Sequence, residues 1–177
     1  MSRHVVVLGG DGIGPEVTGA AVEVLRALDA QQSLGLSFEA HAFGGAAIDA
    51  HGDPFPAQVL AACRKADAIL LGAVGGPQWA KVPTGIRPEA GLLRLRSELG
   101  LYANIRPLTV HPALVDASPL KRERIEGVDL VVVRELTGGI YFGQRTRSET
   151  RATDECAYTV AEVERVTRTA ATLARSR

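Results

Sequence analysis

The chain carries the stretch VVVLGGDGIGPE at residues 5–16. A short apolar run that ends in a glycine-rich turn indicates a buried strand entering a tight loop. Pro15 and Glu16 then favour the first turn of a helix, because proline supplies a suitable φ and a carboxylate is stabilised at the positive end. Apolar residues recur at helical spacing as far as Leu25. The stretch therefore predicts a strand, a loop and a helix.

The residues that follow continue this alternation of strands and helices. We expect a weak strand over 36–43, a helix over 56–64 and a stronger strand over 68–74. Together with the opening elements they form a βαβαβ pattern, which is typical of a parallel α/β sheet. A long loop then leads to an amphipathic helix over 88–99.

The last third of the chain has a different pattern. A strand over 102–106 is expected to stop at Pro107, and the apolar run at 128–133 predicts a buried strand. Glycines near 138–143 indicate turns, the polar residues 144–155 an exposed excursion, and 160–174 a final helix. No glycine cap follows that helix, so the sequence reads as cut there.

Composition narrows the class of protein. Apolar residues make up 46% of the chain and charged residues 23%, the balance of a folded globular protein. Twenty basic and twenty acidic residues cancel, so we expect neither nucleic acid nor a membrane surface as a partner. Cys63 and Cys156 are far apart, which indicates a reduced, cytoplasmic protein, and the histidines lack zinc-site spacing.

The glycine loop has two possible roles. A strand, a turn and a helix N-terminus can together bind an anion or a nucleotide. However, a Rossmann fingerprint would need glycine where Pro15 stands, and the GK[ST] of a Walker loop is missing. A purely structural turn and a ligand loop both remain open.

The helix over 88–99 offers a second candidate. Glu89, Leu92, Leu93 and Arg96 are three and four residues apart, so they share one face. An apolar patch beside a fixed cation suits a small acid that carries a branched alkyl group. An ordinary amphipathic helix whose arginine extends past buried leucines also accounts for the pattern.

Two further arginines stand at strand ends. Arg106 shares a strand face with Tyr102 and Asn104, and Arg134 follows the apolar run 130–133. The carboxyl end of a buried strand is where ligands bind in open α/β sheets. A charge at such a position is costly unless it is paired.

Three arginines could hold two carboxylates. Arg96 would join the two strand-end arginines through bidentate contacts, although pairing with Glu135 or Glu89 is the alternative for any one of them. Tyr141 lies among glycines. Its phenol would either pack as a buried aromatic group or donate a proton beside the cations.

Five motifs in order carry a family resemblance. They are GDGIGPE at 10–16, LGAVGGP at 71–77, GLLRLR at 91–96, LYANIRP at 101–107 and VRELTGGIYFG at 133–143. Over essentially its whole length the chain resembles the N-terminal half of the 3-isopropylmalate dehydrogenases, a branch of the β-decarboxylating dehydrogenases.

Particular residues favour this branch. Isocitrate relatives tend to carry Ser and Asn where this chain has Ala90 and Leu92, and D-malate and tartrate relatives tend to carry Asn at the place of Leu136. A D-malate-, tartrate- or homoisocitrate-type enzyme remains the alternative, as does a noncatalytic truncated module.

The resemblance implies an α/β fold of the isopropylmalate/isocitrate dehydrogenase type, which is not a Rossmann fold and would be incomplete here. Residues 1–100 would be the first part of the cofactor-side domain. Residues 101–177 would be the first part of a second domain that carries substrate and dimer contacts, so we expect a homodimer for the complete protein.

The implied activity is the oxidative decarboxylation of 3-isopropylmalate with NAD in leucine biosynthesis. Arg96, Arg106 and Arg134 would hold the carboxylates of this dicarboxylate, Leu92 and Leu93 would shape the alkyl pocket, and Tyr141 would protonate the enolate. The residues implied to contact NAD are Ile13 and, within 76–89, Gly76, Pro77, Gln78, Trp79, Ile86 and Glu89.

The resemblance also implies what the chain lacks. Relatives are about twice as long, and their other half supplies a catalytic lysine and the aspartates that bind Mg²⁺ or Mn²⁺. We therefore expect no metal ligands within these residues, no turnover from the 177-residue chain alone, and marginal stability, since roughly half of the core would be missing.

Overall fold

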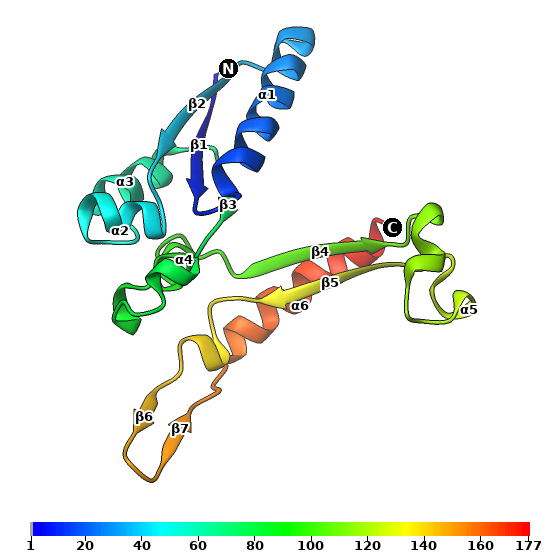
Figure 1. The fold of residues 1–177 in the computed structure, drawn as a ribbon. Coiled ribbons are helices and arrows are strands. Elements are labelled where there is room, and N and C mark those ends of the chain that lie inside the picture. The colour runs from blue at the N-terminus through cyan, green and yellow to red at the C-terminus, as the bar shows by residue number, and fades with distance from the viewer. Residues whose placement is uncertain (1) are drawn as a thin grey trace. The chain divides into compact units, whose positions relative to one another are not determined.

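The computed structural model describes residues 2–177 and divides into two compact units, Met1–Leu99 and Gly100–Arg177 (Figure 1). Unit 1 contains a three-stranded sheet of β1 (Arg3–Gly10), β2 (Leu36–His41) and β3 (Ala68–Ala73). The strand order is β2-β1-β3, and both pairings are parallel. The predicted parallel βαβαβ unit is therefore confirmed.

Four helices surround this sheet: α1 (Gly14–Gln32), α2 (Gly45–His51), α3 (Ala57–Lys65) and α4 (Pro88–Glu98). Short 3₁₀ turns at Pro77–Trp79 and Thr84–Ile86 interrupt the loop before α4. Sequence analysis missed α2, because it is only seven residues long and begins directly after Gly44, which has a positive φ.

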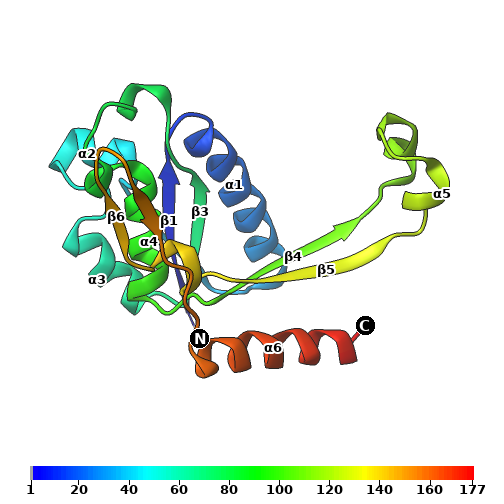
Figure 2. The ribbon, with the colours of Figure 1, turned by 90° about the horizontal axis from the view of Figure 1, so that it is seen from below.

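The core of unit 1 lies between the sheet and helices α3 and α4. Its buried members are Val6, Leu8, Phe43, Phe55, Val59, Cys63 and Leu95. The rings of Phe43 and Phe55 meet edge to face, with centroids 5.4 Å apart. In both ribbon views α1 lies on the opposite side of the sheet from α3 (Figures 1 and 2). Burial raises the pKa of the Cys63 thiol, so this cysteine is a packing group.

Asp11 connects the loops that follow the three strands. Its carboxylate is 3% exposed. Oδ2 accepts hydrogen bonds from the backbone N–H of Gly45 and Gly75, and Oδ1 accepts one from Ala46, each at 2.8 Å. The residue thus joins the turn after β1 to the start of α2 and to the turn after β3.

Unit 2 is built on a ladder of β4 (Ala103–Thr109) and β5 (Asp129–Glu135), which pair antiparallel. A 3₁₀ turn at Pro112–Ala117 and α5 (Arg122–Ile125) connect them. A 3₁₀ turn at Gly139–Tyr141 leads to the hairpin of β6 (Arg145–Arg147) and β7 (Ala152–Asp154), and then to α6 (Val160–Arg175). Figure 2 shows α6 running beside β4 and β5.

A capping box explains where α6 begins, and the hairpin before it lies at the surface. The helix α6 begins at Thr159, whose hydroxyl accepts from the Glu162 N–H while the Glu162 carboxylate accepts from the Thr159 N–H, forming a capping box. The hairpin β6–β7 is exposed throughout. This confirms the exposed excursion expected over 144–155.

Two expectations for unit 2 were wrong. The first strand continues through Pro107 to Thr109, because β4 is the edge of a two-stranded ladder and a proline without an N–H is tolerated there. The second strand is not buried: Leu130 and Val132 are 42% and 49% exposed. Helix α6 packs against β5, so the side chains on the other face of the ladder stay open.

The substitution Asp11→Asn should destabilise unit 1 by about 2–4 kcal/mol, because three backbone N–H groups would lose a charged acceptor and at least one would face the amide NH₂ donor. Trp79 is the only tryptophan and lies buried in unit 1, so its fluorescence during urea unfolding reports the change. The matched control is Asp116→Asn, a surface carboxyl paired with Arg122, which should cost less than about 1 kcal/mol. Equal effects of the two substitutions would contradict this role for Asp11.

Candidate functional site

The carboxyl ends of the parallel strands form one candidate region of unit 1. The glycine loop closes on itself there: a Cβ on Gly14 would lie 2.2 Å from the Gly9 carbonyl oxygen and 2.9 Å from the Ala73 nitrogen. The backbone N–H groups at the start of α2 already bind the Asp11 carboxylate. Close packing and an internal anion therefore favour the structural interpretation of this loop over that of a phosphate cradle.

The residues predicted to contact NAD differ in exposure. Pro77, Gln78, Ile86 and Glu89 are exposed, and so is Ile13 at the N-terminus of α1. They can contact a bound molecule without rearrangement of the core.

Trp79 and the glycines beside it have internal partners. Trp79 is buried, and its indole N–H donates to the Asp49 carboxylate at 3.0 Å. Gly76 is half-buried. The preceding Gly75 has a φ of 100°, and a Cβ there would lie 2.6 Å from Glu89 Oε1, so the Glu89 carboxylate sits directly against this turn.

Helix α4 divides its side chains between core and surface. Leu95 is buried, and Leu92 packs partly against the core cluster. Leu93 and Arg96 are half-buried. The packing of Leu92 supports the amphipathic-helix interpretation for that residue, whereas Leu93 and Arg96 keep surface available for a ligand.

In unit 2 the structure brings two predicted site residues into contact. The Arg134 guanidinium donates a hydrogen bond to the Tyr141 hydroxyl and lies 5.2 Å from the centroid of its ring. Tyr141 belongs to the 3₁₀ turn Gly139–Tyr141 and is exposed. The phenol therefore stands beside a fixed cation at the surface, not inside a packed core.

Arg106 lies on the same face of the ladder. Asn104 is the partner of Arg134 across the strands, and residues two apart on a strand share a face. The Arg106 Nε–H also donates to Asn104 Oδ1. Arg106 and Arg134 thus share one face of the ladder, where bidentate contacts to a carboxylate are possible, and the Tyr141 phenol adjoins them through its contact with Arg134.

A cavity of about 320 Å³ adjoins this contact. The residues lining it are Arg134, Glu135, Ile140, Tyr141, Tyr158, Val163 and Val166. A cation, a phenol and aliphatic groups therefore border one space within unit 2.

Glu135 has a role that sequence analysis missed. It pairs with Arg165 at 3.0 Å, whereas the sequence offered it as an alternative partner for any one of the three candidate arginines. Burial opposes ionisation of this carboxyl, but hydrogen bonds from the Thr137 hydroxyl, the Gly138 and Thr137 N–H groups and Arg165 outweigh it and lower the pKa. The available signal was the position of this acid, directly after Arg134 and three residues before a pair of glycines.

The comparison with protein families gives one decisive match. The family described as isocitrate/isopropylmalate dehydrogenase matches residues 4–177. The chain belongs to this family.

Individual relatives agree with the assignment. A 3-isopropylmalate dehydrogenase of Acinetobacter baylyi is 49% identical over 180 residues, which cover 98% of this chain and 50% of the relative. One of Streptococcus mutans is 54% identical over 175 residues, covering 99% of this chain and 50% of the relative. The chain spans about half the length of the curated relatives it matches.

Solved structures confirm the expected fold, and the chain again covers slightly less than half of each neighbour. A β-decarboxylating dehydrogenase of Thermococcus kodakarensis gives a TM-score of 0.69 at 34% identity and covers 99% of this chain and 46% of that one. An isocitrate dehydrogenase of Methylococcus capsulatus gives 0.73 at 27% identity, covering 98% and 48%.

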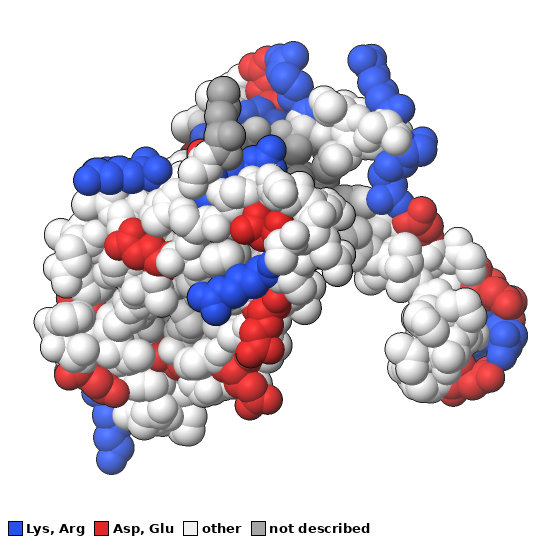
Figure 3. Space-filling model, turned by 90° about the horizontal axis from the view of Figure 1, so that it is seen from above, with Lys and Arg blue, Asp and Glu red and all other residues white. Residues whose placement is uncertain are grey.

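Metal-binding clusters and membrane-spanning helices are both missing from the described residues. Within residues 2–177, no group of three or more His, Cys, Asp or Glu side chains is placed to hold a metal ion. No helix in that range has the length and apolar character to cross a membrane. On the face drawn in Figure 3, basic and acidic side chains are interspersed.

The lowered pKa of Glu135 predicts an acid-sensitive unit 2. A carboxyl whose pKa lies below its ordinary value of 4.5 stabilises the fold above that pH, and this contribution is lost as the pH falls through the folded-state pKa. Glu135→Gln should therefore reduce the loss of stability between neutral pH and the region below pH 4.5. Hydrogen exchange of peptides over residues 129–147, corrected for the pH dependence of the intrinsic rates, measures this loss of stability.

The exposed Glu149 provides the control. Glu149→Gln should leave the pH dependence as in the parent chain. If Glu135→Gln had the same pH profile as the parent chain and the Glu149→Gln control, Glu135 would not be a stabilising anion.

Proposed function

We propose that this chain is the N-terminal half of an NAD-dependent enzyme that oxidatively decarboxylates 3-isopropylmalate in leucine biosynthesis. The observation that carries the proposal is the contact of Arg134 with Tyr141 on the face that also bears Arg106. A cation beside a surface phenol is what acid catalysis on a carboxylate substrate requires. Curated relatives near 50% identity are named 3-isopropylmalate dehydrogenases.

The residues of this chain would divide the work. Arg106 and Arg134 bind substrate carboxylates through paired N–H donors, and Arg96 on α4 contributes a third guanidinium, as the resemblance implies. Leu93, with the exposed part of Leu92, contacts the branched alkyl group. After carbon dioxide leaves, the Tyr141 phenol donates its proton to the enolate carbon, and the nearby Arg134 cation stabilises the phenolate that remains.

NAD would contact unit 1, and the metal ion would be bound mainly by the other half of the protein. When bound, NAD would supply a hydride acceptor for the hydroxyl-bearing carbon, and Mg²⁺ or Mn²⁺ would supply positive charge that stabilises the substrate. The exposed residues of 76–89 together with Ile13 suit contact with NAD. Since the described residues form no metal cluster, the metal ligands would come from the half that is not in this chain.

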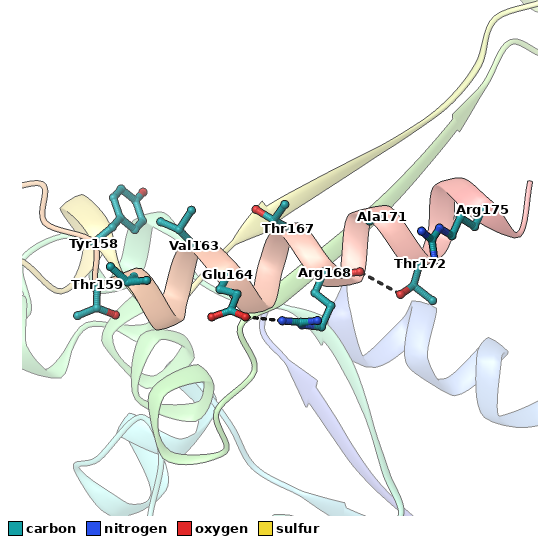
Figure 4. A pocket seen from close by; sticks show the side chains of 10 residues that line it. Tyr158, Thr159, Val163, Glu164, Thr167, Arg168, Ala171, Thr172 and Arg175 are labelled. Carbon is teal, nitrogen blue, oxygen red and sulfur yellow. Dashed lines mark hydrogen bonds and ion pairs between the residues drawn. The ribbon is translucent and has the colours of Figure 1, made fainter.

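A second copy of the protein is the proposed partner, and α6 supplies the surface. No residue of α6 is buried, and Val160 is 83% exposed. Val163, Thr167 and Ala171 follow along the same side of the helix (Figure 4), where a groove of about 810 Å³ runs. This stripe supports a homodimer. The balance of acidic and basic residues remains the ground for proposing a cytoplasmic enzyme that binds neither nucleic acid nor membranes.

A chimera tests the proposed activity. Residues 1–177 are joined to the C-terminal half of the Acinetobacter baylyi relative, and NADH formation from 3-isopropylmalate is followed at 340 nm. We expect turnover from the chimera, with a strong preference over isocitrate, and none from the 177-residue chain alone. A folded chimera without turnover would refute the proposed activity, and turnover by the short chain would refute the expectation that it needs the other half.

Within that chimera, Arg106→Ala separates substrate contact from folding. It should raise KM at least tenfold with little change in melting temperature, because the guanidinium is on an exposed face. Arg124→Ala, an exposed arginine of α5, is the matched control. Loss of stability without a change in KM would assign Arg106 a structural role instead.

The dimer surface is tested by charge on α6. Ala171→Glu should shift the chimera from dimer to monomer in light scattering, since a carboxylate in a buried apolar seam is costly. Ala161→Glu, exposed but away from the stripe, should stay dimeric. A monomeric parent chimera, or a dimeric Ala171→Glu variant, would exclude this face as the interface.

A further inference from the structure

The turn that carries Tyr141 is fixed by a network outside the contact itself. Glu135 Oε2 accepts hydrogen bonds from the N–H groups of Thr137 and Gly138, each at 2.7 Å, and Oε1 accepts one from the Thr137 hydroxyl at 2.7 Å. One carboxylate therefore holds the start of the turn through three donors.

Arg165 of α6 completes the network. Its guanidinium binds Glu135 Oε1 at 3.0 Å, donates to the Thr137 hydroxyl, and stacks 4.9 Å from the centroid of the Tyr102 ring. The side chain of Glu135 is 8% exposed and that of Arg165 is 37% exposed. A partly buried, multiply bonded pair of this kind is more rigid than a surface ion pair, so it can set the position of what it touches.

The far side of the turn is closed as well. The Gly139 N–H donates to the Ala157 carbonyl at 2.9 Å. Gly139 has a φ of 68°, and a Cβ there would lie 2.2 Å from the Tyr158 hydroxyl. The positive φ favours glycine at this position, and the hydrogen bond to Ala157 restrains the turn between β5 and Tyr141.

We propose that Glu135 and Arg165 are positioning residues that hold the Tyr141 phenol against Arg134. The inference rests on the proposed function, because it gives the pair a purpose only if Tyr141 donates a proton. The pair touches neither Arg106 nor the Tyr141 ring; it acts through the turn. A misplaced acid loses rate with little effect on the carboxylate contacts, and a displacement near 1 Å can cost about a hundredfold.

Two variants test the pair in the active chimera. Glu135→Gln removes the charge and keeps the shape, and Arg165→Lys keeps the charge and removes the planar fork. Each should lower kcat by about tenfold to a hundredfold with KM for 3-isopropylmalate within twofold. Glu123→Gln and Arg124→Lys, adjacent exposed residues of α5, are matched controls that should keep the parent kcat.

A second readout does not depend on activity. The 177-residue chain has three tyrosines, so 3-fluorotyrosine labelling gives three ¹⁹F signals that Tyr→Phe substitutions assign. Glu135→Gln and Arg165→Lys should shift or split the Tyr141 signal, whereas the α5 controls should leave it in place.

The outcomes separate the two claims. An inactive but folded parent chimera would contradict the proposed function. The ¹⁹F signal of Tyr141 would still show whether Glu135 and Arg165 fix the position of this phenol. An active parent whose variants keep kcat, or change only KM or melting temperature, would overturn the positioning role. An unmoved Tyr141 signal in both variants would overturn it as well.

Discussion

Each unit of this chain depends on a buried carboxylate that accepts hydrogen bonds from backbone N–H groups of glycine-rich turns. Asp11 directly follows β1, and Glu135 is the last residue of β5. Each satisfies donors that would otherwise be buried without a partner. Because a carboxylate offers acceptors in several directions, one side chain at a strand end fixes several loops at once.

The two carboxylates have different consequences for function. Asp11 fills the anion position at the start of α2, which removes that position from any role in binding phosphate. Glu135 instead leaves Arg134 free of an acidic partner at its own strand end and takes Arg165 in its place. The Arg134 cation, which Glu135 could have neutralised, donates instead to the Tyr141 hydroxyl.

Sequence patterns predicted the structure correctly where the signal is a local periodicity or a turn. The parallel order of unit 1 follows from the alternation of strands and helices, and Gly139 marks a turn whose positive φ favours glycine. The burial of β5 could not be predicted in this way. An apolar run such as 130–133 is typical of a buried strand, whereas Leu130 and Val132 are exposed because α6 packs against only one face of this two-stranded ladder.

The same reasoning applies to the site. Motif order predicted Arg106, Arg134 and Tyr141 as site residues. The partner of Glu135, however, is thirty residues away on α6, a separation that no local spacing predicts. That separation has a physical consequence. Helix α6 touches the turn of Tyr141 through Arg165 on one side and exposes Val160 and Ala171 on another. Docking of any partner on the exposed stripe would restrain the helix that orients the phenol, so assembly and acid catalysis would be coupled through a single side chain.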